Sequence, residues 1–166
     1  MPSRPKSANI GMAAETGERI TMADANSQAL DFERALEAHG LKFDRIDVAE
    51  GDKPLVALNF GGGDFSYNHV RIHVFFDMDG ESAQVVTSPI VSVPADKTAA
   101  VLLAVNSANT RFRWVKFYID DDNDLIAEAD AIISEPTGGE VLTELVGRTA
   151  SIIDDVYADF MRAVWA

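Results

Sequence analysis

The sequence predicts an α+β fold, in which an antiparallel sheet carries helices packed mainly on one face. Apolar residues alternate in several short segments, and acidic turns join these segments in the manner of β-hairpins. Three other segments have the apolar spacing of amphipathic helices. No glycine fingerprint of a βαβ unit is present, so an α/β fold is not expected. The expected order of elements is α-β-β-β-α-β-β-α.

Length and composition indicate one folded domain. The chain has 166 residues, of which 47% are hydrophobic, and this is enough for a single buried core. Residues 1–23 are polar and interrupted by proline and glycine, so we expect a flexible N-terminal tail there and a single domain over residues 24–166. The charged side chains of 1–23 sum to +1. Since the whole chain has a net charge of −13, residues 24–166 carry −14.

Helices are predicted over residues 26–39, over 95–109, and from 137 or 139 to 165. Asp24 or Asn26 can cap the first helix, and Gly40 is a stop signal after it. The second helix follows Pro94, and Asn106 or Asn109 suits its end. The stripe of the last helix is wider than one face needs, because Tyr157 and Trp165 lie beside it. That stripe therefore indicates either core packing or a surface for a dimer or client.

Strands are predicted over six segments: 41–48, 55–60, 67–76, 83–93, 112–119 and 125–133. The clearest is 67–76, where apolar residues face one way and His69, Arg71 and His73 face the other. The segment Asp77–Gly80 has hairpin chemistry. Pro89 within 83–93 indicates an edge or a bulge.

Composition also excludes several classes of function. Without cysteine the chain can form no disulfide, thiolate metal site or cysteine nucleophile, and it suits a reducing cytoplasm. A net charge of −13 disfavours binding to nucleic acid and to an anionic membrane surface. We therefore expect neither a nucleic-acid nor a membrane partner.

No motif for catalysis, a metal or a cofactor is predicted. His69 and His73 lie four residues apart on one strand, about 13 Å, which is too far for them to chelate one ion together. The acidic run Asp120–Asp124 lacks the glycine and glutamate positions of a calcium loop, so we expect a solvated turn. Gly61–Gly63 lacks the lysine and hydroxyl of a phosphate-binding loop and is expected to be a flexible connection.

Three stretches in the second half of the chain form a recognisable motif: VLLAVNSAN (residues 101–109), FRWVKFYID (112–120) and DLIAEA (124–129). They resemble the YbjN family of bacterial sensory transduction regulators. The family shows a helix ending in two asparagines three residues apart, then a strand, an acidic turn and a second strand. The resemblance implies a fold related to the type III secretion chaperones. It also implies a non-enzymatic, dimeric adaptor or chaperone-like domain with no cofactor.

The leading functional hypothesis is a protein-binding homodimer that engages a protein or peptide segment, by burial of apolar surface or by strand addition at an open sheet edge. Five residues are the candidate partner-binding positions: His69, Arg71, His73, Trp114 and Tyr118. One alternative is a ligand- or metal-sensing regulator, or a hydrolase, that uses His69 and His73. That alternative predicts a deep pocket holding a histidine and an acidic neighbour. A dedicated secretion chaperone is the other alternative.

Overall fold

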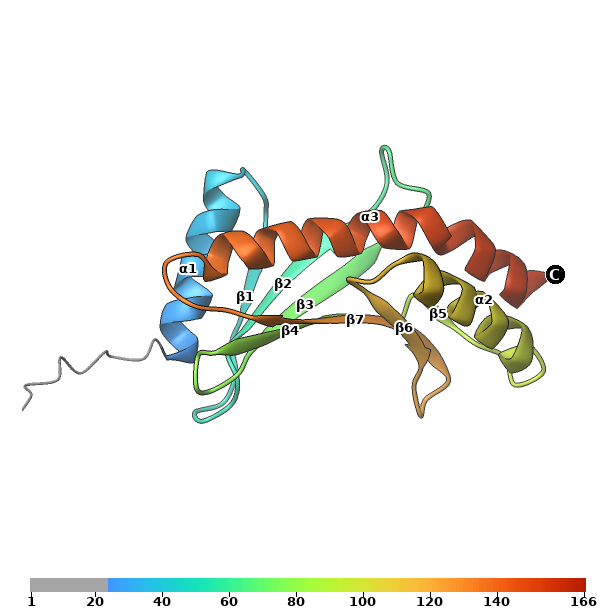
Figure 1. Ribbon diagram of the computed structural model, residues 1–166, viewed down its shortest axis with the longest axis horizontal. Coiled ribbons are helices and arrows are strands. Elements are labelled where there is room, and N and C mark those ends of the chain that lie inside the picture. Colours follow the sequence, from blue (N-terminus) through green and yellow to red (C-terminus); the bar gives the residue numbers. More distant parts are fainter. Residues whose placement is uncertain (1–23) are drawn as a thin grey trace, which may run out of the picture.

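The computed structural model describes residues 24–166 (Figure 1). The predicted flexible tail over 1–23 lies outside these residues. The elements, in chain order, are α1 (Ala25–Ala38), β1 (Asp44–Ile46), β2 (Leu55–Phe60), β3 (Val70–Phe76), β4 (Ser82–Thr87), β5 (Val91–Ser92), α2 (Thr98–Arg111), β6 (Lys116–Ile119), β7 (Asp124–Ile132) and α3 (Gly138–Trp165).

The strands form one antiparallel sheet in the order β1-β2-β3-β4-β7-β5, and β6 also pairs with β7. Figure 1 shows the long helix α3 running across the sheet, with α1 near its start and α2 near its end. The predicted α+β class is therefore confirmed. Five strands separate α1 from α2, whereas the expected order has three and the predicted segments number four, because the segment 83–93 divides into β4 and β5.

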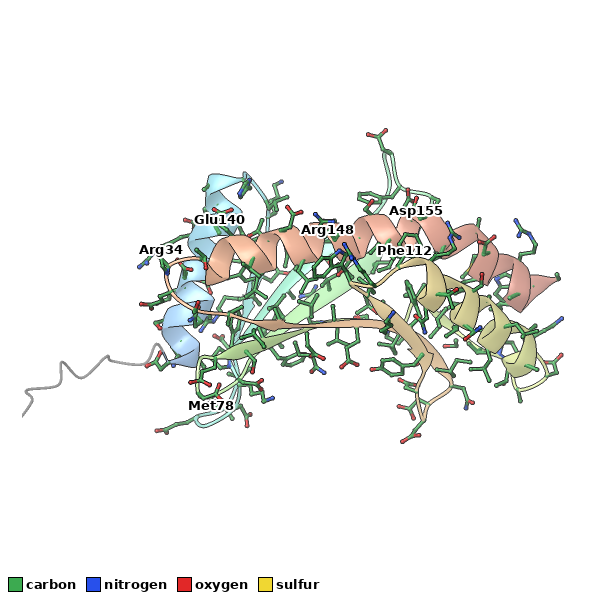
Figure 2. The ribbon with its side chains drawn as sticks, in the orientation of Figure 1. Arg34, Met78, Phe112, Glu140, Arg148 and Asp155 are labelled. Carbon is green, nitrogen blue, oxygen red and sulfur yellow. The ribbon has the colours of Figure 1, made fainter. Side chains whose placement is uncertain are left out.

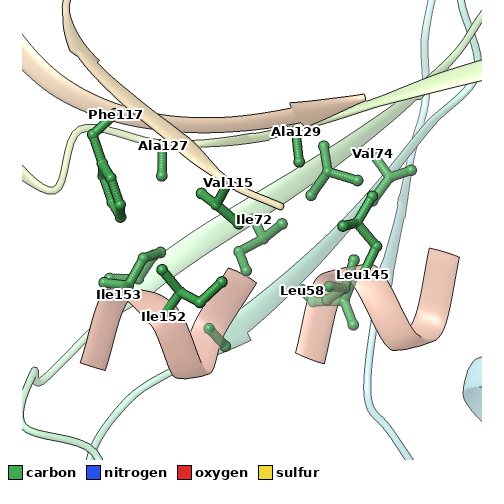
Figure 3. Close-up of a cluster of buried hydrophobic side chains, with 14 of the residues drawn as sticks. Leu58, Ile72, Val74, Val115, Phe117, Ala127, Ala129, Leu145, Ile152 and Ile153 are labelled. Carbon is green, nitrogen blue, oxygen red and sulfur yellow. The ribbon is translucent and has the colours of Figure 1, made fainter. Parts of the chain in front are cut away.

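The core lies between the sheet and α3. Along β3 the side chains of Val70, Ile72, Val74 and Phe76 are buried, and those between them are only half-buried. Figure 3 shows Ile72 and Val74 facing Leu145 and other side chains of α3. The alternation read from the sequence thus points the apolar side of β3 towards the helices.

Helix α1 begins directly after its capping residue, Asp24. The Asp24 carboxylate accepts a hydrogen bond from the Ser27 backbone N–H at 2.8 Å, so the predicted cap is confirmed. Helices α1 and α3 approach closely, since the Gly139 N–H donates to the Asp31 carboxylate at 2.9 Å. At the other end of α3, the ring of Phe160 meets that of Phe117 in β6, with centroids 5.0 Å apart.

Four predicted strands were too long. The segments 41–48 and 67–76 form strands only over β1 and β3. The segment 83–93 divides into β4 and β5 around Pro89, because proline has no N–H for a sheet ladder. The segment 112–119 forms a strand only over Lys116–Ile119, since α2 continues to Arg111. Asn109, one of the two asparagines expected near the end of this helix, lies two residues before its last residue, and its side chain bonds the backbone of Phe117 at 3.0 and 2.8 Å.

The predicted turns at 77–80 and 120–124 are both hairpin connections. Gly80 and Asn123 adopt positive φ angles of 72° and 63° there. In the second turn the Asp120 carboxylate accepts bonds from the backbone N–H groups of Asp122 and Asp124. No helix within 24–166 has the length and apolar character needed to cross a bilayer.

Candidate protein-binding surface

A groove of about 650 Å³ runs between the last residues of β7 and the first half of α3. Its walls are mostly apolar. The residues that line it are Trp114, Asp130, Ala131, Ile132, Glu140, Val141, Glu144, Leu145 and Arg148. We call this the β7–α3 groove.

Large apolar side chains lie exposed along this groove. Ile132 is 92% exposed and Trp114 is 53% exposed, and Val141 of α3 is also exposed. Single exposed apolar residues are ordinary on a protein surface, but several around one groove mark an interaction site. The β7–α3 groove is therefore a candidate docking surface.

One edge of β7 is open beside the groove. Strand β6 pairs with β7 only as far as Glu128, whereas β4 pairs with the other edge as far as Ile132. The Ile133 N–H donates to Glu81 across the β4 edge, and the Leu125 C=O accepts from Ile90 on that same edge. Because backbone direction alternates along a strand, the N–H and C=O groups of Asp130 and Ile132 face the open edge.

The outer edge of β6 is covered, in contrast to that of β7. The Asn109 side chain both donates to the Phe117 C=O and accepts from its N–H, as a neighbouring strand would. The Lys116 ammonium donates to the carbonyls of Asn109 and Phe112 at 2.9 Å each. Covered edge positions are protected from pairing with other chains, so β6 is protected at Phe117, whereas no described strand pairs with β7 at Asp130 and Ile132 on this edge.

The rim of the groove is acidic. Three carboxylates, from Asp130, Glu140 and Glu144, line it beside one guanidinium, from Arg148. Figure 2 shows Glu140 and Arg148 at two positions along α3. Arg148 already bonds Glu144 at 2.8 Å, and its guanidinium lies 5.8 Å from the Trp114 ring centroid. The rim therefore keeps a net negative charge.

Burial and the negative charges of Glu128 and Asp77 raise the pKa of Asp130. An acid whose pKa is raised on folding destabilises the folded state at pH values above that pKa, and the effect disappears as the pH falls through it. We expect Asp130→Asn to raise the urea midpoint at pH 7 and to leave it unchanged at about pH 3. A midpoint at pH 7 below that of the unmodified protein would contradict this.

The structure divides the five predicted partner-binding residues between two places. Trp114 lines the β7–α3 groove. Tyr118 and His73 lie on the face of the sheet that points away from α3, because their neighbours along the strands, such as Phe117, are buried in the core. Arg71 lies on that same face and pairs with Asp44 at 3.0 Å. Neighbouring His69, just before β3, bonds the side-chain amide oxygen of Asn59 at 3.0 Å.

We call the face of the sheet that points away from α3 the open face. Two titratable groups on it have shifted pKa values. Burial, together with a hydrogen bond to Glu128 and its negative charge, raises the pKa of Tyr118 to about 12. Burial and the nearby Arg71 lower the pKa of His73. Both residues are therefore neutral at pH 7, and this face carries Tyr118 as an uncharged hydroxyl and His73 as an uncharged ring.

The geometry around the histidines does not favour the alternative based on His69 and His73. Within residues 24–166 no three His, Asp or Glu side chains are placed to hold one metal ion. Neither His69 nor His73 lines the β7–α3 groove.

Sequence reasoning missed the residues that open the groove. Asp130, Ile132 and Val141 carry no motif, and each belongs to a pattern that also describes ordinary surface or core positions. One signal was available, because the predicted strand 125–133 follows a hairpin turn at 120–124 that brings it back along a partner. Any part of this strand that extends beyond its partner strand has an unpaired edge.

Comparison with known proteins agrees with the fold. The YbjN family model, described as "Putative bacterial sensory transduction regulator", matches residues 31–162. A solved structure described as "YbjN, a putative transcription regulator from E. coli" is similar, with 14% identity and a TM-score of 0.50. The match covers 80% of this chain and 89% of that one. None of the curated proteins searched matches the sequence. Because the family model spans most of the chain, the protein belongs to the YbjN family.

Proposed function

We propose that this chain is a non-enzymatic regulatory module that binds an extended segment of another protein. Its family is described as a regulator of sensory transduction. A regulator without a catalytic site acts through what it binds, and this chain offers a preformed apolar groove beside an open strand edge.

The observation that carries this proposal is the exposure of Ile132 and Trp114 around one groove. Burying such side chains against a partner removes apolar area from water, which stabilises a complex by about 25 cal/mol per Å² before the cost of association. The groove volume of about 650 Å³ is in the range of ligand-binding clefts.

Site-specific crosslinking in a bacterial host that carries this gene tests the proposal. We expect photoreactive p-benzoylphenylalanine in place of Ile132 to form protein adducts that are lost when Trp114→Ala is added. The same group in place of Met78, an exposed residue of the β3–β4 turn, is the matched control and should give none of these adducts. Equal adducts from both positions, or none from Ile132, would contradict the proposal.

The proposal includes a homodimer, formed through the outer face of α2. Leu103 is 74% exposed and Leu102 beside it is also exposed, so this helix presents an apolar surface remote from the acidic groove. We expect light scattering to give twice the chain mass of 18.0 kDa for the unmodified protein and 18.0 kDa for Leu103→Lys. A single-chain mass for both proteins would remove the dimer from the proposal.

The open face of the sheet is proposed as a second contact surface, through His69, Arg71, His73 and Tyr118. Its polar side chains are half-buried or exposed, as at the rim of an interface. We also propose that the protein works in the cytoplasm. The absence of cysteine and the family's description as a regulator support that location.

A further inference from the structure

We propose that the open edge of β7 binds an extended segment that carries a basic residue, by antiparallel strand addition. The segment places Lys or Arg opposite Asp130, a large apolar side chain opposite Ala131, and a second apolar residue opposite Ile132. This inference rests on the proposed function and specifies the chemistry of the partner.

Backbone geometry sets the length of the added strand. Beyond its pairing with β6, strand β7 leaves Ala129–Ile132 unpaired on this edge, a length of about 13 Å. Asp130 and Ile132 each present one N–H and one C=O there, as the alternation set by Ile133 requires. The residues of the segment opposite Asp130 and Ile132 would therefore exchange backbone hydrogen bonds with β7. The residue between them would direct its own N–H away from β7.

Side-chain alternation sets which residues fit. Ala131 points to the helix side of the sheet, where the groove is lined by Val141, Leu145 and Trp114. Ala131 is small, so the residue opposite it can be large and fill the groove. Ile132 and Asp130 point to the other side, and residues opposite them lie within about 5 Å between Cβ atoms. Apolar and basic partners match these two positions.

The charge of the rim favours a basic partner segment over a second copy of the chain. Asp130 forms no salt bridge with any residue of 24–166, and Glu140 and Glu144 add negative charge to the rim. Two β7 edges paired with each other would bring both sets of carboxylates together, and like charges directly opposite destabilise a strand pair. The negative charges that raise the pKa of Asp130 would also attract a cation placed beside it.

The test uses an end-blocked, fluorescein-labelled peptide, Thr-Ser-Ile-Leu-Lys-Val-Thr-Ser, which we call the lysine peptide. Binding to the full chain is measured by fluorescence anisotropy. We expect a version with Glu in place of Lys to bind about tenfold more weakly. N-methylation of the Lys and Ile backbone nitrogens should abolish binding, because these groups donate to β7. N-methylation of the Leu nitrogen, which faces away, is the matched control and should leave the affinity within about twofold.

Protein variants test the same contacts from the other side. Asp130→Lys should reverse the preference, so that the Glu version binds more tightly than the lysine peptide. Asp121→Lys makes the same charge change in the exposed β6–β7 turn and should preserve the original preference. Circular dichroism of both variants checks that they are folded.

Four results would overturn the inference. The first is equal affinity for the Lys and Glu peptides, and the second is equal loss from N-methylation at Lys and at Leu. The third is absence of binding by every peptide at about 1 mM. The fourth is a lower molecular mass for the Asp130→Lys variant but not for Asp121→Lys, because this would assign the β7 edge to a second copy of the chain. If crosslinking at Ile132 succeeds while these peptide tests fail, the groove binds a protein but not by this strand addition.

Discussion

Phe160→Ala is expected to lower the free energy of unfolding by about 3–5 kcal/mol. Phe160 is fully buried and its ring meets Phe117 edge to face, so truncation leaves a cavity beneath the β6–β7 hairpin. A loss of this size is a large part of the 5–15 kcal/mol that stabilises a typical domain. Urea denaturation followed by circular dichroism measures the loss.

Trp165→Ala is the matched control for this substitution. It removes a large aromatic side chain from the same helix, but Trp165 is 73% exposed. We expect a change within about 0.5 kcal/mol. Equal losses for Phe160→Ala and Trp165→Ala would mean that the end of α3 is not packed against the sheet as described.

Gly139→Ala is expected to destabilise the protein by about 1–3 kcal/mol. A Cβ atom at Gly139 would lie 2.5 Å from the Asp31 carbonyl oxygen, so α1 and α3 would have to separate. The bond from the Gly139 N–H to the Asp31 carboxylate would lengthen as they did so. The same denaturation measurement reports this effect.

A second glycine of α3 gives the opposite expectation. A Cβ atom at Gly147 would meet nothing within 4 Å, so Gly147→Ala gains helix propensity without a clash. We expect it to stabilise the protein by about 0.5–1 kcal/mol. If both alanine variants change stability in the same direction, the close approach of α1 and α3 at Gly139 is wrong.

Much of the fold could be predicted from local patterns. The alternation along β3, the Asp24 cap and the two acidic hairpin turns each depend on a few neighbouring residues, and the structure has all of them. The end of α2 could not be predicted in this way. Asn109 is an ordinary residue for a helix terminus, yet its side chain bonds a strand eight residues later.

The candidate site was less accessible from sequence. Trp114 was selected because it is a large aromatic residue in an apolar stretch, and the structure places it in the groove. Its expected neighbour Tyr118 lies on the opposite face, because the chain does not form a strand until Lys116 and the two residues do not share one alternation. Ile132 could not be distinguished from a core residue, since only pairing across the sheet shows that its edge of β7 is open.

These features suggest how regulation could work without catalysis. Both sides of the β7–α3 groove are folded in the free protein, since β7 pairs with β4 and α3 packs on the core. Most of the conformational entropy lost on binding would therefore come from the partner segment, and this loss weakens binding and favours reversible association.

Amide hydrogen exchange of β7, followed by NMR, tests the central claim most directly. In the free protein we expect the Asp130 and Ile132 amides to exchange rapidly, while that of Ala131, which faces β4, exchanges slowly. Saturation with the lysine peptide should slow exchange at Asp130 and Ile132 by at least about tenfold and leave Ala131 unchanged. Slow exchange of Asp130 and Ile132 in the free monomer would contradict the account, as would protection by the peptide at α2 rather than at β7.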